Sequence, residues 1–228
     1  MMKPADVLIQ HALKIGALEL LPEGRELKSG RVSPYFFNSG LFTNAISLNI
    51  LSKTLGDTFK EHWGILGHPT VIFGPAYKGI TLSTLAVSNL GHPFNKGFHG
   101  VQYAHDRKEE KAHGEGGRIV GASLKDQRVV IIDDVITTGG TKDDAVELIT
   151  EQGGTTTGLV VLFDRQERSS DSELSAAQEF SKKHHIPIVA VATLKDLIEF
   201  IQSHTARSSS TRGILELIKS YQKEYGVY

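Results

Sequence analysis

Four consecutive apolar residues followed by two acids constrain the fold of this chain more than any other segment. The run Val129–Ile132 indicates a β-strand buried on both faces, because it lacks the polar alternation of a strand with one wet face. Asp133 and Asp134 follow directly, and a turn rich in threonine and glycine leads into helical apolar spacing over 145–149. The segment therefore predicts a strand–turn–helix unit with two carboxylates at the strand's carboxyl end.

The turn in this unit has the chemistry of an anion site. Backbone N–H groups at a helix start are unpaired, and the helix dipole favours negative charge there. Two adjacent carboxylates beside such a turn are costly unless hydroxyl donors or a metal ion pair with them. The unit points to a phosphorylated sugar as ligand. The alternative is an ordinary strand–turn–helix with two exposed acids.

Composition narrows the class of protein. The chain has 228 residues and a hydrophobic content of 39%, enough for one large domain. The lack of cysteine excludes disulfides, thiolate metal ligands and thiol nucleophiles. A net charge of −1 gives no general attraction to nucleic acid or to an anionic membrane. The start has no secretory core and no apolar run reaches about 18 residues, so we expect a soluble, cytoplasmic protein.

Strands alternate with helices through most of the chain, which favours an α/β fold with a mostly parallel sheet flanked by helices. We expect a single domain over 1–228, with a small cap from about 1–40 and part of the C-terminus. Ser47 is the expected N-cap of the second helix. Helices are expected over 5–17, 48–59, 79–90, 174–185, 194–203 and from 214, strands over 35–38, 70–73, 98–103, 158–163 and 186–192, and irregular chain over 20–34.

Two further segments carry cations near expected strand ends. Lys78 lies in a Gly74–Gly79 loop that precedes a helix, where a cation can meet an anion held by the loop backbone. The alternative is a solvated turn lysine. Residues 104–118 are strongly polar and glycine-rich, which is typical of a lid loop over a polyanion. The alternative is a solvated hairpin.

Cations and aromatic rings also occur together. Lys28 precedes Phe36 and Phe37, and a planar anionic ring can stack on a phenylalanine and bind a lysine. The alternative is that both phenylalanines pack in the core, where most phenylalanines of globular proteins lie. Arg165, just after another buried strand, can hold a carboxylate bidentately. A surface ion pair with Asp164 or Glu167 is equally compatible with the sequence.

Together these segments resemble the orotate phosphoribosyltransferases, a family of type I phosphoribosyltransferases. The matching segments occur in family order over 27–31, 33–42, 73–80, 107–117, 129–141 and 164–167. The resemblance implies the type I phosphoribosyltransferase fold with an N-terminal cap (hood) and a mobile lid loop over 104–118. It also implies transfer of the phosphoribosyl group of 5-phosphoribosyl 1-diphosphate (PRPP) to orotate. The products would be orotidine 5′-monophosphate and diphosphate, in de novo pyrimidine (UMP) biosynthesis.

The resemblance assigns residues to each part of the reaction. The orotate contacts would be Lys28, Phe36, Phe37, Thr137 and Arg165. The PRPP contacts would be Lys28, Tyr77, Lys78, Arg107, Lys108, Lys111, His113, Asp133, Asp134, Val135, Ile136, Thr137, Thr138, Gly139, Gly140 and Thr141. The catalytic group would be Arg107, Lys111, His113, Asp133 and Asp134. Mg²⁺ would be held mainly through diphosphate and ribose, without direct protein ligands. A homodimer would share its two active sites, each lid completing the neighbour's site.

The match has departures and rivals. Asp106, Glu110 and Ala112 differ from the usual lid, and Thr138-Gly139-Gly140 differs from the usual Ala-Gly-Thr of the phosphate loop. These changes put rate and lid kinetics in doubt. Phosphoribosyl transfer to a purine or to uracil is a rival reaction. A PRPP-sensing regulator that binds nucleic acid is a rival of another class. The stretch after Glu167 is too short for the barrel of a fused decarboxylase.

Overall fold

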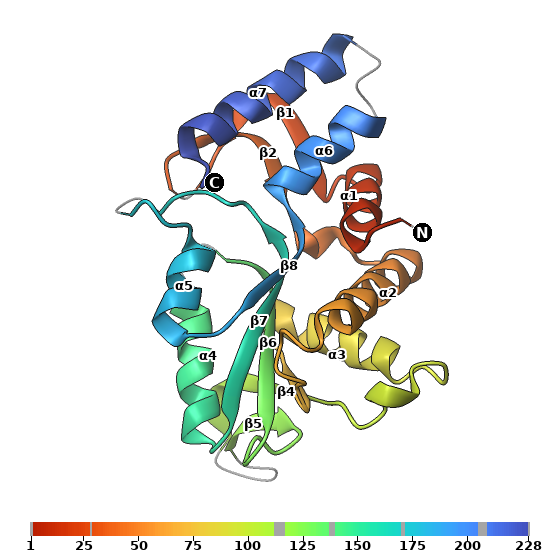
Figure 1. Cartoon of the computed structure of the whole chain (residues 1–228), viewed down its shortest axis with the longest axis vertical. Helices are drawn as coiled ribbons and strands as arrows, with labels where there is room; N and C mark the ends of the chain where they lie inside the picture. Colours follow the sequence, from red (N-terminus) through yellow and green to blue (C-terminus); the bar gives the residue numbers. More distant parts are fainter. Residues whose placement is uncertain are drawn as a thin grey trace.

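A six-stranded sheet in the order β5-β4-β3-β6-β7-β8 forms the centre of the molecule (Figure 1). The structure is a computed structural model that describes residues 2–27, 29–111, 117–136, 140–169, 172–204 and 209–227, and the side chains outside 109–111 and 209–211. The strands are β3 (Val71–Phe73), β4 (Gln102–Lys111), β5 (Gly117–Gly121), β6 (Arg128–Val135), β7 (Thr155–Asp164) and β8 (Ile188–Thr193). All neighbours pair in parallel except β5, which is antiparallel to β4. The predicted fold class is confirmed.

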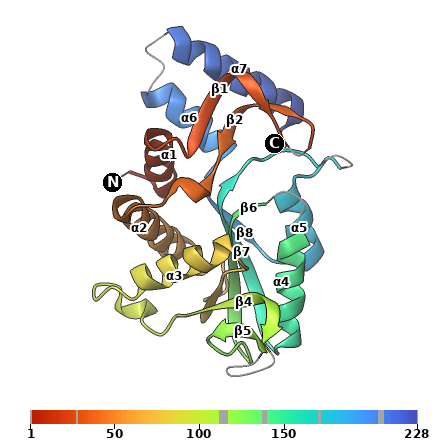
Figure 2. The ribbon, with the colours of Figure 1, turned by 180° about the vertical axis from the view of Figure 1, so that it is seen from behind.

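Helices cover both faces of this sheet, as Figures 1 and 2 show. The helices are α1 (Pro4–Lys14), α2 (Ala45–His62), α3 (Lys78–Leu90), α4 (Gly140–Glu151), α5 (Ala176–His184), α6 (Leu194–His204) and α7 (Ser209–Tyr225), with short 3₁₀ turns at Ser39–Leu41 and Lys96–Phe98. Helices α4 and α5 lie along one side, and α1, α2 and α3 lie along the other.

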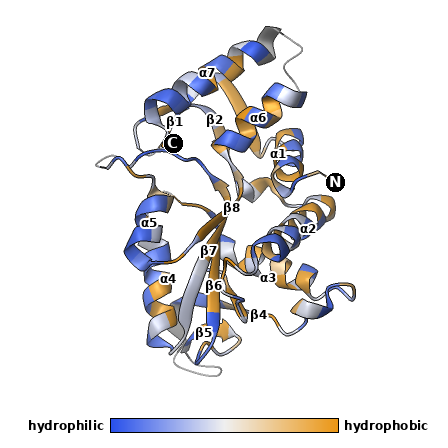
Figure 3. Ribbon diagram, viewed as in Figure 1, coloured by the Kyte–Doolittle hydropathy of each residue, from blue (hydrophilic) through white to orange (hydrophobic). Residues whose placement is uncertain are grey.

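The alternation of side chains along β6 explains why both faces are covered. Val129 and Ile131 belong to the core packed under α4 and α5. Val130 and Ile132 point to the opposite face and join the core formed with α1, α2 and α3. All four are fully buried, and Figure 3 shows apolar residues concentrated along the central strands. The continuous apolar run is therefore required by a strand that has helices on both sides.

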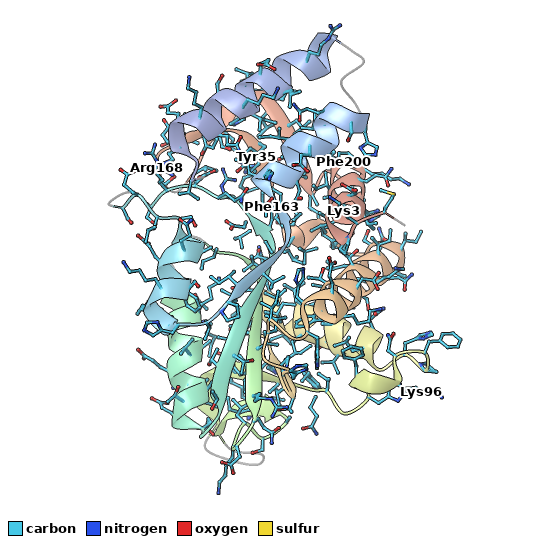
Figure 4. The ribbon with its side chains drawn as sticks, in the orientation of Figure 1. Lys3, Tyr35, Lys96, Phe163, Arg168 and Phe200 are labelled. Atoms are coloured by element: carbon cyan, nitrogen blue, oxygen red, sulfur yellow. The ribbon has the colours of Figure 1, made fainter. Side chains whose placement is uncertain are left out.

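A two-stranded antiparallel sheet, β1 (Leu18–Glu26) and β2 (Val32–Phe37), forms a cap at one end of the molecule with α7 (Figure 2). Phe163, at the end of β7, joins this cap to the main sheet. Its ring stacks on Phe37 with centroids 5.3 Å apart and lies 6.0 Å from the ring of Tyr35. Figure 4 shows Tyr35 and Phe163 close together at this junction.

Several local predictions were wrong. Residues 20–34 hold most of β1 and the start of β2, because pairing between the two strands overrides the glycine and polar content of the segment. Residues 96–98 form a 3₁₀ turn, and β4 begins only at Gln102. Most of the predicted 104–118 loop is strand, since β4 and β5 pair with each other. Asn44, whose side chain accepts a hydrogen bond from the Ser47 amide, caps α2 in place of Ser47.

Truncation of Phe163 tests the junction between cap and sheet. Phe163→Ala is expected to lower the free energy of unfolding by about 3–5 kcal/mol, because the ring is 1% exposed and leaves a cavity. Phe94→Ala is the matched control, since that ring is 90% exposed and its loss should change stability by less than about 0.5 kcal/mol. Urea denaturation measures both. An equal loss of unfolding free energy in the two variants would contradict the role of Phe163 at the junction between cap and sheet.

Candidate active site

The predicted chemical groups meet at one edge of the main sheet. Strands β4, β3, β6 and β7 are neighbours and parallel, so their carboxyl ends lie side by side. The loop with Lys78 follows β3, the acid pair ends β6, and Arg165 follows β7. Ligands of open α/β sheets bind at this edge. The Lys78 loop and the acid pair, which the sequence placed at strand ends, therefore lie at the same edge as Arg165.

The acid pair is buried, and each carboxylate is paired with a lysine. Asp133 and Asp134 are each 8% exposed. The ammonium group of Lys142, in the first turn of α4, contacts Oδ2 of Asp133. Nζ of Lys78, at the start of α3, lies 2.5 Å from Oδ2 of Asp134, and Ser39 Oγ donates to the same oxygen at 2.8 Å. The two acids are thus held by both helical layers and by the cap.

The surroundings of Asp134 favour its ionised form. Burial alone raises the pKa of the Asp134 carboxyl, but the hydrogen bond and positive charge of Lys78 act in the opposite direction. Hydrogen bonds from Ser39 and from the Val135 amide add to this effect. The net result is a pKa below the usual value, so Asp134 is a carboxylate at neutral pH.

The loop after β3 is compact because two glycines touch. A Cβ on Gly74 would lie 1.9 Å from the carbonyl oxygen of Gly79, so no side chain fits there. The Ala76 amide donates to Oδ1 of Asp106 on β4 at 2.6 Å, and the Ala76–Tyr77 peptide is cis. Tyr77 itself is 73% exposed. This packing fixes the loop backbone beside the acid pair.

The far part of β4 carries the predicted lid cations. Strand β3 pairs with β4 only over Gln102–Ala104, so the later residues of β4 extend beyond the sheet edge with β5 alone. Arg107 donates to the Gly117 carbonyl at 3.3 Å, and Lys108 is exposed. The structure thus describes an antiparallel strand pair, which agrees with the hairpin alternative for this segment, where a lid loop was predicted. The Lys111 side chain and His113 lie outside the described residues.

A buried ion pair closes the cap side of the site. Nη2 of Arg165 lies 2.7 Å from Oε1 of Glu167 and donates to Ser33 Oγ at 2.9 Å. Burial keeps the pKa of Tyr35 well above its usual value, although the charge of Arg165 opposes this, so the phenol stays protonated. It donates to Oε1 of Glu167 at 3.1 Å. The sequence analysis offered a surface ion pair of Arg165 with Asp164 or Glu167 as an alternative. The ion pair with Glu167 is confirmed, but its two side chains are largely buried rather than at the surface.

Tyr221 lies beside the same ion pair. Its hydroxyl interacts with both Arg165 and Glu167, and burial, followed by the charge of Glu167, raises its pKa to about 12. The ion pair is therefore flanked by two phenols, Tyr35 and Tyr221, that stay protonated at neutral pH.

The two adjacent phenylalanines lie on opposite faces of β2. Phe37 is 9% exposed and belongs to the core through its stacking on Phe163. Phe36 is only partly buried and has Arg25 over its ring at 4.0 Å. Phe37 is therefore a core residue, as the alternative prediction stated. The ring of Phe36 is partly exposed to solvent.

The remaining predicted residues lie at the start of α4 or outside the described chain. Val135 is partly buried, and Ile136 is 5% exposed and belongs to the core. Gly140 and Thr141 open α4 and are exposed. The predicted residues outside the described chain are Lys28, Thr137, Thr138 and Gly139.

Sequence reasoning missed several residues that the structure brings to the site. Ser39 carries no distinctive signal, because serine is common in turns. Tyr35 was taken only as a strand residue. Lys142 does carry a signal, since it lies three residues before Ala145 and seven before Ile149, on the buried face of α4. A lysine on such a face implies a paired carboxylate.

The described residues offer neither a cluster of metal ligands nor a membrane-spanning helix. Among the residues that the structure describes, no group of three or more His, Asp or Glu side chains is placed to hold a metal ion. No helix in the described ranges is both long enough and apolar enough to cross a membrane.

Comparison with known proteins agrees with this architecture. Residues 42–195 match the phosphoribosyl transferase domain family, so fold and site define a phosphoribosyltransferase. An orotate phosphoribosyltransferase of Chromobacterium violaceum is 42% identical over 200 residues, 88% of this chain and 87% of the relative. One of Kluyveromyces lactis is 40% identical over 88% of this chain and 86% of the relative. The chain belongs to the orotate phosphoribosyltransferase family.

A solved structure supports the same assignment. The crystal structure of orotate phosphoribosyltransferase from Francisella tularensis matches with a TM-score of 0.82 and 32% sequence identity. The match covers 96% of this chain and 98% of that protein. The cap and the main sheet are therefore both part of the shared fold.

The pairing of Asp134 predicts how stability depends on pH. A carboxyl whose pKa is lower in the folded state contributes stability above its unfolded pKa of about 4, and this is lost as pH falls through the folded pKa. Asp134→Asn should therefore flatten the loss of unfolding free energy below about pH 4. Urea titrations from acid to neutral pH measure it. If the unfolding free energy of Asp134→Asn fell as steeply with decreasing pH as that of wild type, the Lys78–Asp134 pair would be ruled out as a source of stability.

Proposed function

We propose that this site transfers the phosphoribosyl group of PRPP to orotate, giving orotidine 5′-monophosphate and diphosphate. The observation that carries the proposal is the buried acid pair at the end of β6, beside the N-terminus of α4 and beneath the cap. Carboxylate oxygens accept hydrogen bonds from ribose hydroxyls, and a helix N-terminus attracts the 5′-phosphate. The reaction belongs to pyrimidine biosynthesis.

The sugar is held from two directions. Asp133 and Asp134 accept hydrogen bonds from the ribose hydroxyls, and their neighbours Val135 and Ile136 complete the strand end. The loop at 137–141 wraps the 5′-phosphate with backbone N–H groups at the start of α4. The position of Gly140 and Thr141 at the first turn of α4 supports this assignment.

Cations on the other side stabilise the leaving diphosphate. As the bond from the anomeric carbon to diphosphate breaks, the sugar gains oxocarbenium character and negative charge accumulates on the leaving group. Lys78 lies at the correct sheet edge, and its side chain is 53% exposed, so it can turn from Asp134 to an arriving diphosphate. Tyr77, Arg107, Lys108, Lys111 and His113 supply further contacts, and the closed ribbon of β4 and β5 keeps water from the activated sugar.

The base pocket suits an anionic ring. Arg165 is fixed by Glu167 and Ser33, and its planar guanidinium group suits the carboxylate of orotate. Lys28 and Thr137 contact the polar edge of the ring, Phe36 offers a face for stacking, and Phe37 forms the apolar floor. Purines and uracil carry no carboxylate, so this set of groups favours orotate over the rival bases.

The acidic groups fit Mg²⁺ that arrives with the substrate. Carboxylate oxygens are ligands that Mg²⁺ prefers, but both acids are already paired with lysines. Asp133 and Asp134 would hold the ion through the ribose hydroxyls. When bound, Mg²⁺ supplies positive charge to the diphosphate oxygens.

Orotate consumption tests the reaction directly. Loss of orotate absorbance should require both PRPP and Mg²⁺, and uracil or hypoxanthine should not replace orotate. Turnover of either of these bases in place of orotate would assign a different phosphoribosyltransferase. Salt-sensitive binding of RNA or DNA without any turnover would favour a regulator instead.

Exchange of subunits tests the lid and the proposed homodimer together. Lys111→Ala should lower kcat by about 100-fold, as the loss of one charged transition-state contact does. Asp134→Asn should also be nearly inactive. If each lid serves the partner's site, mixed dimers of the two variants regain one intact site, giving about one quarter of wild-type activity after random exchange. No recovery on mixing would show that the lid acts within its own chain.

A further inference from the structure

Lys142 is a buried cation that the proposed reaction does not use. It is 7% exposed and lies on the face of α4 that also buries Ala145 and Ile149. Burial of an ammonium group is costly unless an anion pairs with it. The only ion pair that the structure gives to Lys142, within the described residues, is with Asp133.

Asp133 is held at both oxygens. Its Oδ1 accepts a hydrogen bond from the Asp134 amide at 2.9 Å, and its Oδ2 contacts the Lys142 ammonium group. Both side chains of the pair are largely buried, at 9% exposure for Lys142 and 12% for Asp133. The carboxylate therefore has one fixed orientation, and its counter-ion has no route into solvent without a movement of α4.

Asp134 is paired differently. Its lysine, Lys78, has a side chain that is 53% exposed and is carried by the compact loop after β3. An exposed lysine can leave its partner when a stronger anion such as diphosphate arrives. The two acids thus have one exchangeable and one permanent counter-ion.

Together the two lysines balance the charge of the two acids. Two carboxylates facing two ammonium groups leave no net negative charge at the strand end. A divalent cation is attracted to uncompensated carboxylates, and this charge is already compensated in the protein alone.

We propose that Lys142 is a positioning residue that serves as a permanent counter-ion of Asp133. It fixes the orientation of the Asp133 carboxylate toward the ribose. It also prevents the acid pair from binding a divalent cation before the substrate arrives. The role of the fixed orientation rests on the proposed function. The control of cation binding does not, because it is a property of the substrate-free protein. Lys142 acts through Asp133 and does not contact the reacting atoms.

Mn²⁺ binding to the substrate-free protein tests the proposal. Wild type should show no Mn²⁺ site at the acid pair by electron paramagnetic resonance. Lys142→Met should create a site that binds Mn²⁺ at least about tenfold more tightly than any weak binding to wild type, because one carboxylate is now uncompensated. Lys142→Arg should restore the wild-type result. Lys183→Met is the matched control, since Lys183 pairs with Asp143 at 2.9 Å but is exposed, so its loss should add no site.

The outcomes separate the role of Lys142 from the identity of the substrate. Equal Mn²⁺ binding in wild type and Lys142→Met, whether as a site of the same affinity or as no site in either protein, overturns the proposal, even if the protein consumes orotate. A gain of Mn²⁺ binding supports it, even if another base proves to be the substrate. If Lys142→Met does not fold, the double variant Asp133→Asn/Lys142→Met decides. If the double variant folds, Lys142 is needed only to neutralise Asp133, which supports the proposal. If the double variant does not fold, Lys142 is required for something other than the charge of Asp133, and the proposal is overturned.

Discussion

The structure depends on the burial of two adjacent carboxylates at the end of a strand that is covered on both faces. Such charges persist only where partners neutralise them. The partners come from three separate elements: Lys78 begins α3, Lys142 lies in the first turn of α4, and Ser39 belongs to the turn after the cap. Neutralisation of the acids therefore ties both helical layers and the cap to one point, and that point is where we propose that the ribose binds.

The cap is joined to the sheet by a second cluster of the same kind. Glu167 accepts a hydrogen bond from Tyr35 and is paired with Arg165, while Arg31 lies 3.7 Å from its other oxygen. Phe37 and Phe163 stack beneath this cluster and supply the apolar part of the junction. The side chain of Glu167 thus connects β2, through Tyr35, with the segment that follows β7. The residues proposed to bind the base are consequently among those that hold the cap in place.

Sequence reasoning reached the parallel sheet and placed the Lys78 loop and the acid pair at strand ends, because each depends on a local pattern whose period and order can be read directly. It failed where pairing between distant segments decides the structure. Strand β1 forms because β2 lies beside it, and the ribbon of β4 continues because β5 pairs with it. The ion pair of Lys142 was not anticipated because its partner lies nine residues away across a turn. The face of α4 on which Lys142 lies was nevertheless readable from the apolar spacing.

The hydrogen bond between the Ala76 amide and Asp106 has a mechanical consequence. Asp106 lies on the part of β4 that extends past the sheet, whereas Ala76 belongs to the tightly packed loop beside the acids. The position of the loop is therefore linked to the position of β4, and neither segment can move far without breaking this bond.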